Sequence, residues 1–459
     1  MVGSMFPVEK IAQIVGGELL RRESVSPTRA IHDSRLVEQG DLFVALSGNQ
    51  SDGHRFVAEA FDRGASAAII SDTSNLPSNA RNLVFVANPA LALQQWAAAW
   101  RDTLEATFVA ITGTNGKTTV RALLHHLLSA QRTVYSSPHN YNTEIGLPIA
   151  LLSMPASAEL GIFELGTEQP GDIALLARIL RPHLGIITSV GPGHLDRFET
   201  VAAVSSEKWS LVNQLPENGE VIINADVPIL LDLASSAKAS VVTVGLDHGD
   251  VRGHILQTVP SVKVSLDAPA VTLTAALAGT HNAENLLLAS VAAHRLEMSW
   301  SAIADQTTTF RPIPHRLDPI RVSFGTVLDD TYNANPASMK AALKVLATFG
   351  EDNALRVFVF GEMLGLGADS ESFHRTIAQL ALNLPIHAIL PIGNAAITAC
   401  RTVADASALA EGFENPKVIV LPRSEIASWI RNRTAQMVVL VKGSRALALE
   451  SLVDELKNS

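Results

Sequence analysis

The segment from Thr107 to Thr119, TFVAITGTNGKTT, limits the possible folds of this chain more than any other stretch. It begins with an apolar run of β-strand type, passes through a glycine-rich turn, and ends in Lys-Thr-Thr. After it, apolar residues recur at the spacing of one helix face, at Val120, Leu123, Leu124, Leu127 and Leu128. A strand, a glycine-rich loop, a Lys-Thr pair and a helix make up the layout of a phosphate-binding loop.

The match is to the short form Gly-x-x-Gly-Lys-Thr, because Ile111 stands where the longer form has its first glycine. In such a loop backbone N–H groups and the helix N-terminus face an anion, the lysine reaches a β/γ-phosphate, and the threonine hydroxyl binds Mg²⁺. We therefore predict a nucleotide site made of Gly113, Thr114, Asn115, Gly116, Lys117, Thr118 and Thr119. The alternative is an ordinary strand-to-helix turn that carries a surface lysine.

Length and composition narrow the class of protein. A chain of 459 residues suggests about three domains, and 47% hydrophobic with 17% charged residues permits several packed cores. No apolar run reaches the length of a transmembrane helix, and the N-terminus lacks a basic segment followed by an apolar one. We therefore expect neither membrane insertion nor a secretory signal.

Cysteine usage and charge exclude further classes. The single cysteine, Cys400, leaves no internal disulfide and no cysteine-based zinc site, which fits a reducing cytoplasm. The net charge of −10 argues against a nucleic-acid partner. A bound nucleotide must then have its charge met locally, by Lys117, Mg²⁺ and helix N-termini.

Strands and helices alternate through the middle of the chain. The predicted strands are 107–112, 132–135, 160–165, 184–190, 221–224 and 241–244, and the predicted helices are 118–130, 172–181 and 200–214. This order predicts an α/β fold with a mostly parallel sheet covered by helices on both faces. In such sheets ligands bind beyond the carboxyl ends of the strands. The alternating pattern of residues 250–275 predicts short antiparallel strands.

Three domains are predicted. Residues 1–90 form a small α/β domain, and residues 91–312 form the central domain with the phosphate-binding loop. Two prolines in the segment 310–316, FRPIPHR, indicate a boundary. Residues 313–459 alternate strands and helices again and are predicted to form a Rossmann-like α/β domain.

Polar residues of the central domain fall where strands end or helices begin. Glu164 ends a strand, Asn142 and Thr143 stand just before a helix, and His194 follows a strand. Lys208 lies on the helix after it. The charged and histidine residues each have a plain alternative interpretation. Glu164 can be a solvated or salt-bridged carboxylate, His194 a structural histidine and Lys208 a surface lysine. Together at one sheet edge they suggest a site for magnesium and for carboxylate activation.

Further polar pairs stand outside this group. Asn282 and Asn285, in GTHNAEN, open a helix, where their amides suit an adenine edge or serve only as caps. In the third domain Asp330 ends a strand and Asn333 follows it, which suggests another ligand edge.

The first domain contains one such cluster. Ser34 and Arg35, in HDSR, are candidates for a polar ligand, against the alternative of a helix N-cap and a surface ion pair.

Taken together, GTNGKTT, Glu164, His194 with Lys208, GTHNAEN and KGSR resemble the Mur ligases, ATP-dependent amide-forming enzymes of peptidoglycan precursor synthesis. HDSR, LFVALSG and DGH resemble the family's N-terminal domain, which binds the UDP-sugar. LDDTYNANPASMKAAL and FGEMLGLGADSESFH resemble the members that join D-alanyl-D-alanine to UDP-N-acetylmuramoyl-tripeptide. The resemblance implies these two substrates, ATP and Mg²⁺, a cytoplasmic location and a monomer.

The resemblance also implies roles for the residues. Lys117, Glu164, His194 and Lys208 would be catalytic. Thr118 and Glu164 would hold one Mg²⁺, and His194 with a carbamylated Lys208 a second. Other ATP contacts would come from Arg316 at the γ-phosphate, Asp330 at the ribose, Asn282 and Asn285 at the adenine, and Asn333. Substrate contacts would come from Ser34, Arg35, Asn142 and Thr143.

Because these residues come from three domains, the third domain is expected to close onto the loop.

Three competing interpretations remain: a nucleotide-dependent switch or regulatory ATPase, a non-enzymatic scaffold, and a Mur-type ligase with another acceptor.

Overall fold

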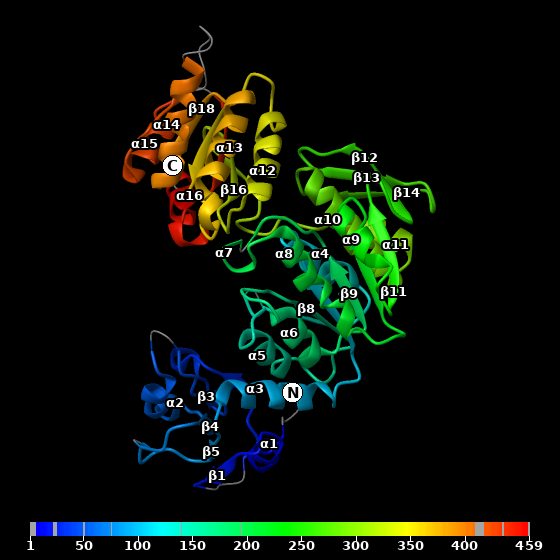
Figure 1. Ribbon diagram of the computed structural model, residues 1–459, viewed down its shortest axis with the longest axis vertical. Helices are drawn as coiled ribbons and strands as arrows, with labels where there is room; N and C mark the ends of the chain where they lie inside the picture. The colour runs from blue at the N-terminus through cyan, green and yellow to red at the C-terminus, as the bar shows by residue number, and fades with distance from the viewer. Residues whose placement is uncertain are drawn as a thin grey trace.

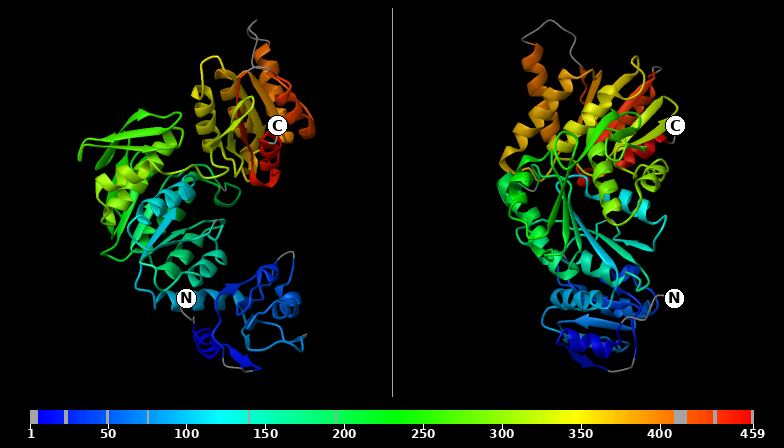
Figure 2. Two further views of the ribbon diagram at one scale, coloured as in Figure 1. Left: turned by 180° about the vertical axis from the view of Figure 1, so that it is seen from behind. Right: turned by 90° about the vertical axis from the view of Figure 1, so that its right-hand side faces the viewer.

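The computed structural model describes residues 6–21, 25–48, 51–74, 76–138, 140–193, 195–408, 417–433 and 436–457. These residues form three α/β units along the long axis of the molecule, each built on its own sheet (Figure 1). The first unit and the third lie at opposite ends of the central one (Figure 2). None of the helices in the described ranges combines the length and apolar character that crossing a bilayer requires.

The first unit contains a five-stranded sheet in the order β1-β5-β4-β3-β2. Its strands are β1 Glu18–Leu20, β2 Ala30–Ile31, β3 Leu42–Val44, β4 Ala67–Ile70 and β5 Leu83–Phe85, with only β1 antiparallel to its neighbour. Its helices are α1 Val8–Ile14 and α2 Val57–Asp62, and single 3-10 turns cover Ser34–Leu36 (η1) and Gly53–Phe56 (η2).

Helix α3, Pro89–Arg101, joins the first unit to the central one through a shared apolar core. Trp96 on this helix is fully buried. The same cluster contains Leu42 and Val44 of β3 and also Phe108 of the central sheet. Since α3 packs on both sides, the division between residues 90 and 91 stays a prediction.

The central sheet has nine strands in the order β14-β13-β12-β11-β10-β9-β6-β8-β7. The strands of its parallel part are β6 Thr107–Thr112, β7 Val134–Ser136, β8 Leu160–Glu164, β9 Leu184–Ile187, β10 Glu220–Asn224 and β11 Ser240–Gly245. β12 Val251–Gln257, parallel to β11, is followed by antiparallel β13 Val262–Leu266 and β14 Val271–Ala275. Both the parallel sheet and the antiparallel strands within 250–275 are confirmed.

Helices cover both faces of this sheet. They are α4 Lys117–Leu128, α5 Gly146–Leu152, α6 Asp172–Leu180, α7 Leu195–Phe198, α8 Val201–Trp209, α9 Pro228–Ala234, α10 Thr280–Arg295 and α11 Trp300–Thr307. Alternate residues of β6 face opposite layers: Phe108 packs in one core with α5 and α6, and Val109 in the other with α4 and α10. A strand buried on both faces explains why this segment reads as one apolar run.

Two predicted elements of the central unit were too long. β9 ends at Ile187 rather than at residue 190, because the chain turns there and the side chains of Thr188 and Ser189 bond to the phosphate-binding loop. The helix predicted to reach residue 214 ends at Trp209 and continues as a 3-10 turn, η3 Val212–Gln214. At this break the Ser210 hydroxyl donates to the Glu207 carbonyl, a local bond that competes with helix continuation.

The third unit contains a six-stranded sheet in the order β15-β16-β20-β17-β18-β19. Its strands are β15 Asp318–Val322, β16 Gly325–Asp330, β17 Leu355–Gly361, β18 Ala388–Ile392, β19 Lys417–Val418 and β20 Met437–Lys442, all parallel to their neighbours except β15. Helices α12 Pro336–Thr348, α13 Ser370–Asn383 and α14 Asn394–Ala408 share a core on one face, and α15 Arg423–Arg431 and α16 Glu450–Lys457 share one on the other. β19 covers only two residues at the edge of this sheet.

Candidate active site

Three neighbouring strands bring the predicted site to one edge of the central sheet. β6 lies between β8 and β9, with Ile111 opposite Glu164 and Thr112 opposite Ile187. All three run parallel, so Glu164, the phosphate-binding loop and the segment after Ile187 share the carboxyl edge. The prediction that polar residues meet at this edge is confirmed for Glu164 and the loop.

The loop leaves the N-terminus of α4 open to an anion. Gly113 and Gly116 have φ angles of 152° and 88°, which favour glycine. Within the described chain no side chain caps α4, so its first N–H groups lack intrahelical acceptors and suit a phosphate.

Lys117 begins α4 and folds back over the loop. Its Nζ donates to the carbonyl oxygen of Gly113 at 2.6 Å. Burial lowers the pKa of the Lys117 amine; the carboxylate of Glu164 opposes this shift, and the charge of Arg316 adds to it. The side chain is half-buried rather than free on the surface, which disfavours the interpretation as a surface lysine.

The segment after β9 holds the loop in shape. The backbone N–H of Asn115 donates to Ser189 Oγ at 2.9 Å, and Thr188 Oγ1 donates to the Asn115 carbonyl at 2.5 Å. Thr114 also donates its backbone N–H to the Ser189 carbonyl at 2.9 Å. These anchors were not predicted, because Thr188 and Ser189 fall inside the predicted strand 184–190.

Glu164 is buried and held from two sides. Arg121 Nε donates to its Oε1 at 2.7 Å, and the Thr118 hydroxyl donates to its Oε2 at 3.2 Å. Glu164 is therefore salt-bridged, as the alternative interpretation expected, and the same carboxylate also contacts the Thr118 hydroxyl of the loop. Arg121 was not predicted, because in the sequence it looks like an ordinary polar position on an amphipathic helix.

Arg316 reaches this site from the third unit. Its Nη2 donates to Thr118 Oγ1 at 3.3 Å. The flanking residues His315 and Leu317 both have left-handed backbone conformations, with φ angles of 65° and 54°, which are uncommon outside glycine. His315 Nδ1 lies 2.9 Å from Asp329 Oδ2, so the turn that presents Arg316 is fixed by a buried carboxylate.

Two more contacts connect the third unit with the loop region. Asn335 Nδ2 donates to Asn115 Oδ1 at 2.7 Å, and the Tyr332 hydroxyl bonds to Asn140 Oδ1. The Arg316 guanidinium lies over the Tyr332 ring, 3.8 Å from its centroid. The two units thus meet through polar side chains at the loop itself.

The predicted third-unit residues differ in their surroundings. Asp330 ends β16 and pairs with Lys442 Nζ at 2.6 Å, so the lysine of KGSR is buried against a carboxylate rather than open to an anion. Asn333 is exposed, and its Oδ1 accepts from the N–H of Ala334 at 2.9 Å.

Lys208 is buried beside the loop. Only 3% of the surface of this residue is exposed, and in the described ranges its Nζ has no hydrogen-bond or ion-pair partner. Burial and then the charge of Lys117 lower the pKa of its amine to about 7, against an opposing effect of Glu207. Lys208 is therefore not the surface lysine of the alternative interpretation, and much of its amine is neutral near pH 7. His194 lies outside the described residues.

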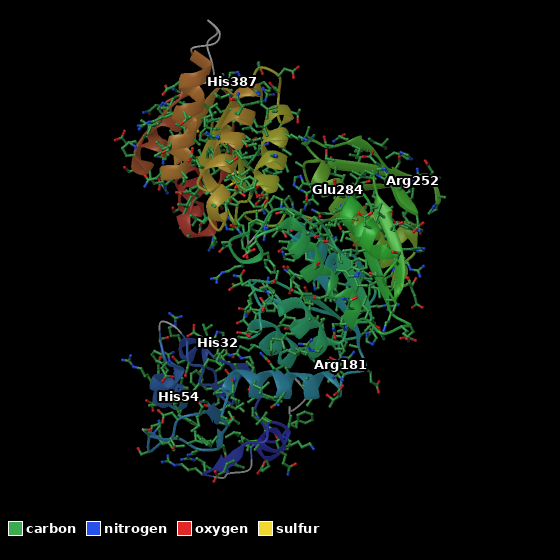
Figure 3. The ribbon with its side chains drawn as sticks, viewed as in Figure 1. His32, His54, Arg181, Arg252, Glu284 and His387 are labelled. Carbon is green, nitrogen blue, oxygen red and sulfur yellow. The ribbon has the colours of Figure 1, made fainter. Side chains whose placement is uncertain are left out.

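Asn282 and Asn285 lie at the start of α10, directly behind the loop. Asn285 Nδ2 donates to Asn282 Oδ1 at 3.0 Å, and Asn282 Nδ2 donates to the carbonyl of Ala278 at 2.8 Å. On the same turn Glu284, marked in Figure 3, accepts from Asn224 at 3.1 Å, and its burial raises the pKa of its carboxyl.

The first-unit candidates lie far from the loop. Ser34 Oγ donates to Glu59 at 3.1 Å, and Arg35 pairs with Asp33 at 2.7 Å. Figure 3 marks the neighbouring His32 on this unit; burial lowers the pKa of its imidazole.

Asn142 and Thr143 belong to the central unit and stand before α5. Thr143 Oγ1 accepts from the N–H of Gly146 at 3.2 Å, and the Asn142 carbonyl accepts from Gly166 at 2.8 Å.

The residues around Glu164 fit one nucleotide-bound Mg²⁺. Such ions are usually held by one or two carboxylates together with phosphate oxygens, and here one carboxylate stands beside one threonine hydroxyl and the loop. In the described ranges no group of three His, Cys, Asp or Glu side chains offers a complete metal cage. An unmodified Lys208 beside Lys117 does not suit a cation, because both side chains are amines. A second metal ion at this place would require a modification that makes the Lys208 side chain negatively charged.

The fold and the site together define a nucleotide-dependent enzyme of the phosphate-loop class. Residues 31–101 match the Mur ligase family catalytic domain, residues 111–293 the Mur ligase middle domain, and residues 315–445 the Mur ligase glutamate ligase domain. The UDP-N-acetylmuramoyl-tripeptide–D-alanyl-D-alanine ligase of Escherichia coli is 30% identical over 461 residues, which cover 98% of each chain. The chain belongs to the Mur ligase family.

Other relatives match over the whole length. The ligase of the same name from Bacillus subtilis is 29% identical over 465 residues, with 98% of each chain covered. MurF from Acinetobacter baumannii superimposes with a TM-score of 0.89 at 26% identity, covering 99% of this chain and 100% of that one. MurF from Thermotoga maritima, in complex with ADP, gives a TM-score of 0.80 at 25% identity, covering 94% and 97%.

Replacing the loop lysine tests the phosphate site. Lys117→Ala is expected to lower the kcat/KM of ATP-dependent phosphate release by about 10²-fold or more, because a preorganised charge on the transferred phosphate is lost. Lys340→Ala, on the exposed face of α12, is the matched control and should be unchanged. Normal turnover of a folded Lys117→Ala protein would refute the assignment of the loop.

The contact between Asn335 and the loop can be separated from its capping role. Asn335→Ala removes the N-cap of α12 and the bond to Asn115, whereas Asn88→Ala removes only the N-cap of α3. Both are expected to lose about 1 kcal/mol of unfolding free energy. Only Asn335→Ala should weaken the binding of a non-hydrolysable ATP analogue, by about threefold or more, which calorimetry can measure. If both variants bind the analogue equally well, the contact of Asn335 with the loop does not contribute to nucleotide binding.

Proposed function

We propose that this chain joins D-alanyl-D-alanine to UDP-N-acetylmuramoyl-tripeptide in an ATP-dependent reaction that forms an amide bond. One observation carries the proposal. A chain that matches the ligases of that name over 98% of its length also assembles a phosphate-binding loop, a buried carboxylate and an arginine from a second unit at one point.

The first step activates the acid. The free carboxylate at the end of the tripeptide attacks the γ-phosphorus of ATP, the bond to the β,γ-bridging oxygen breaks, and ADP leaves with that electron pair. This turns a carboxylate, whose leaving group would be oxide, into an acyl phosphate. Lys117 and the N-terminus of α4 hold the β/γ-phosphates, and Arg316 balances charge on the γ-phosphoryl group from the opposite side.

The second step forms the amide. The amine of D-alanyl-D-alanine attacks the acyl carbon, the bond to the phosphate oxygen breaks, and phosphate and one proton are released. Water would destroy the acyl phosphate, so the site must be enclosed while it exists. The contacts of Arg316, Tyr332 and Asn335 bring the third unit onto the loop region, and we propose that this unit shields the acyl phosphate from water.

Glu164 and Thr118 would hold the Mg²⁺ that accompanies ATP, which neutralises phosphate charge and orients the γ-phosphoryl group. For a second ion we propose carbamylation of Lys208. The neutral amine adds to CO2 and releases a proton, and the product is an anion in place of an ammonium. Support comes from burial, the missing partner among described residues, and a pKa of about 7; His194 would complete this site.

Further contacts follow from the family. We propose that Asn282 and Asn285 contact the adenine of ATP and that Asp330 contacts its ribose, with Asn333 as a further ATP contact. Ser34 and Arg35 are proposed to contact the UDP-sugar. Asn142 and Thr143 are proposed to contact the tripeptide substrate. The monomeric state and the cytoplasmic location stay predictions.

The acceptor requirement decides between a ligase and a regulatory ATPase. Phosphate release is expected only when ATP, Mg²⁺, UDP-N-acetylmuramoyl-tripeptide and D-alanyl-D-alanine are all present. A ligase for another acceptor would respond to single amino acids instead of the dipeptide, and tripeptides ending in lysine or diaminopimelate should both be tried. Phosphate release from ATP alone at the full rate would overturn the proposal.

Carbamylation of Lys208 predicts a definite pH dependence. Only the neutral amine reacts, so at constant CO2 pressure the carbamate signal in carbon NMR with labelled CO2 should grow from about pH 6 to about pH 8, as the amine loses its proton. Lys208→Ala should lose both the signal and most activity, and regain part of the activity with added short carboxylic acids. A Lys208→Arg protein with the full rate would remove the carbamate from the mechanism.

A further inference from the structure

Arg121 lies one helical turn after Thr118 on α4, so both side chains face the end of β8. Its Nε bonds to Glu164 Oε1 at 2.7 Å, and each of the two side chains has only 9% of its surface exposed. No step of the proposed reaction uses this arginine, although it touches the carboxylate assigned to Mg²⁺.

The guanidinium is anchored at its other end. Nη1 of Arg121 donates to Ser136 Oγ at 2.6 Å and to the Ser137 carbonyl at 2.9 Å. Ser137 Oγ in turn accepts from the N–H of Glu164 at 3.4 Å. The end of β7 therefore fixes the arginine and the strand end that carries the carboxylate in one network. A planar guanidinium with several donors suits this geometry better than a lysine does.

The network gives the two oxygens of Glu164 different tasks. Oε1 is occupied by Arg121, and Oε2 is the oxygen that faces the Thr118 hydroxyl. Lys117 and Arg316 also lie within electrostatic range of this carboxylate. Without Arg121 the bond to Oε1 is lost, and the Glu164 carboxylate is free to rotate away from the Thr118 hydroxyl.

We propose that Arg121 is a positioning residue, which fixes Glu164 so that Oε2 is presented together with Thr118 to the metal ion of the bound nucleotide. The inference rests on the proposed metal site and adds the residue that orients its carboxylate. This role differs from that of a purely structural ion pair. Losing a structural pair would lower the stability of the protein but leave the metal affinity of the folded protein unaltered. Residues that orient a metal ligand typically change metal affinity by 10–100-fold when they are replaced.

The test measures metal binding directly. Mn²⁺ replaces Mg²⁺, and its affinity for the full-length protein with a non-hydrolysable ATP analogue is followed by electron paramagnetic resonance. Arg121→Met is expected to weaken Mn²⁺ binding by about tenfold or more. Arg121→Lys should weaken it less, since an ammonium keeps the pair with Glu164 but cannot also reach Ser136 and Ser137.

Two controls separate the possible failures. Arg132→Met removes an arginine just beyond the end of the same helix, one that pairs with the exposed Glu297, and should bind Mn²⁺ as the wild type does. Glu164→Gln should lose Mn²⁺ affinity; if it does not, the proposed metal site itself is wrong.

Calorimetry with the same analogue, with and without Mg²⁺, provides a second readout. In the Arg121 variants the gain in nucleotide affinity that Mg²⁺ gives should shrink, while affinity without Mg²⁺ stays near the wild-type value. If Glu164→Gln behaves as expected but folded Arg121→Met binds Mn²⁺ like the wild type, Arg121 has no positioning role. Should Arg121→Met fail to fold, Arg121→Gln, which also removes the charge that pairs with Glu164, takes its place, and wild-type Mn²⁺ affinity in that variant overturns the inference in the same way.

Discussion

The parallel pairing of β6 with β8 and β9 is the constraint on which the site depends. It places the phosphate-binding loop, Glu164 and the Thr188–Ser189 pair at one sheet edge, although they are far apart in the chain. The loop is then shaped by its neighbours as much as by its own glycines, because hydroxyls after β9 bond to both the N–H and the carbonyl of Asn115. A rigid, open helix N-terminus is the result.

The third unit contributes to this edge through a turn that the backbone does not adopt easily. Arg316 stands between two residues of left-handed conformation, and His315 is tied to the buried Asp329. Such backbone conformations persist only when the surroundings hold them. Here they present Arg316 to Thr118 and place Tyr332 beneath its guanidinium, so the third unit brings charge to the place where the γ-phosphate is expected.

Local charge at the site is opposite to that of the whole chain. The net charge is −10, yet Lys117, Arg121 and Arg316 gather around Glu164. Such a cluster suits a triphosphate with its metal ion and does not require a basic surface. Lys208, buried close by with a lowered pKa, adds a group whose charge is easily changed.

Much of the architecture followed from the sequence, because the alternation of apolar runs and helical periods is local information. The β6 strand, its loop and α4 were predicted with nearly the right bounds, as were the strands around Glu164. Short elements such as β1, β2 and β5 were missed, since a few residues carry too little periodic signal.

What the sequence by itself determined is the nucleotide loop, the alternating α/β order and the family to which the chain belongs. Only the tertiary structure decided that Arg121 forms a salt bridge with Glu164, that Ser189 hydrogen-bonds to the loop, and that Lys208 is buried without a partner among the described residues. The physical reason is that these facts depend on contacts between segments far apart in the chain, and a side chain's burial, partner and pKa arise only when such segments meet.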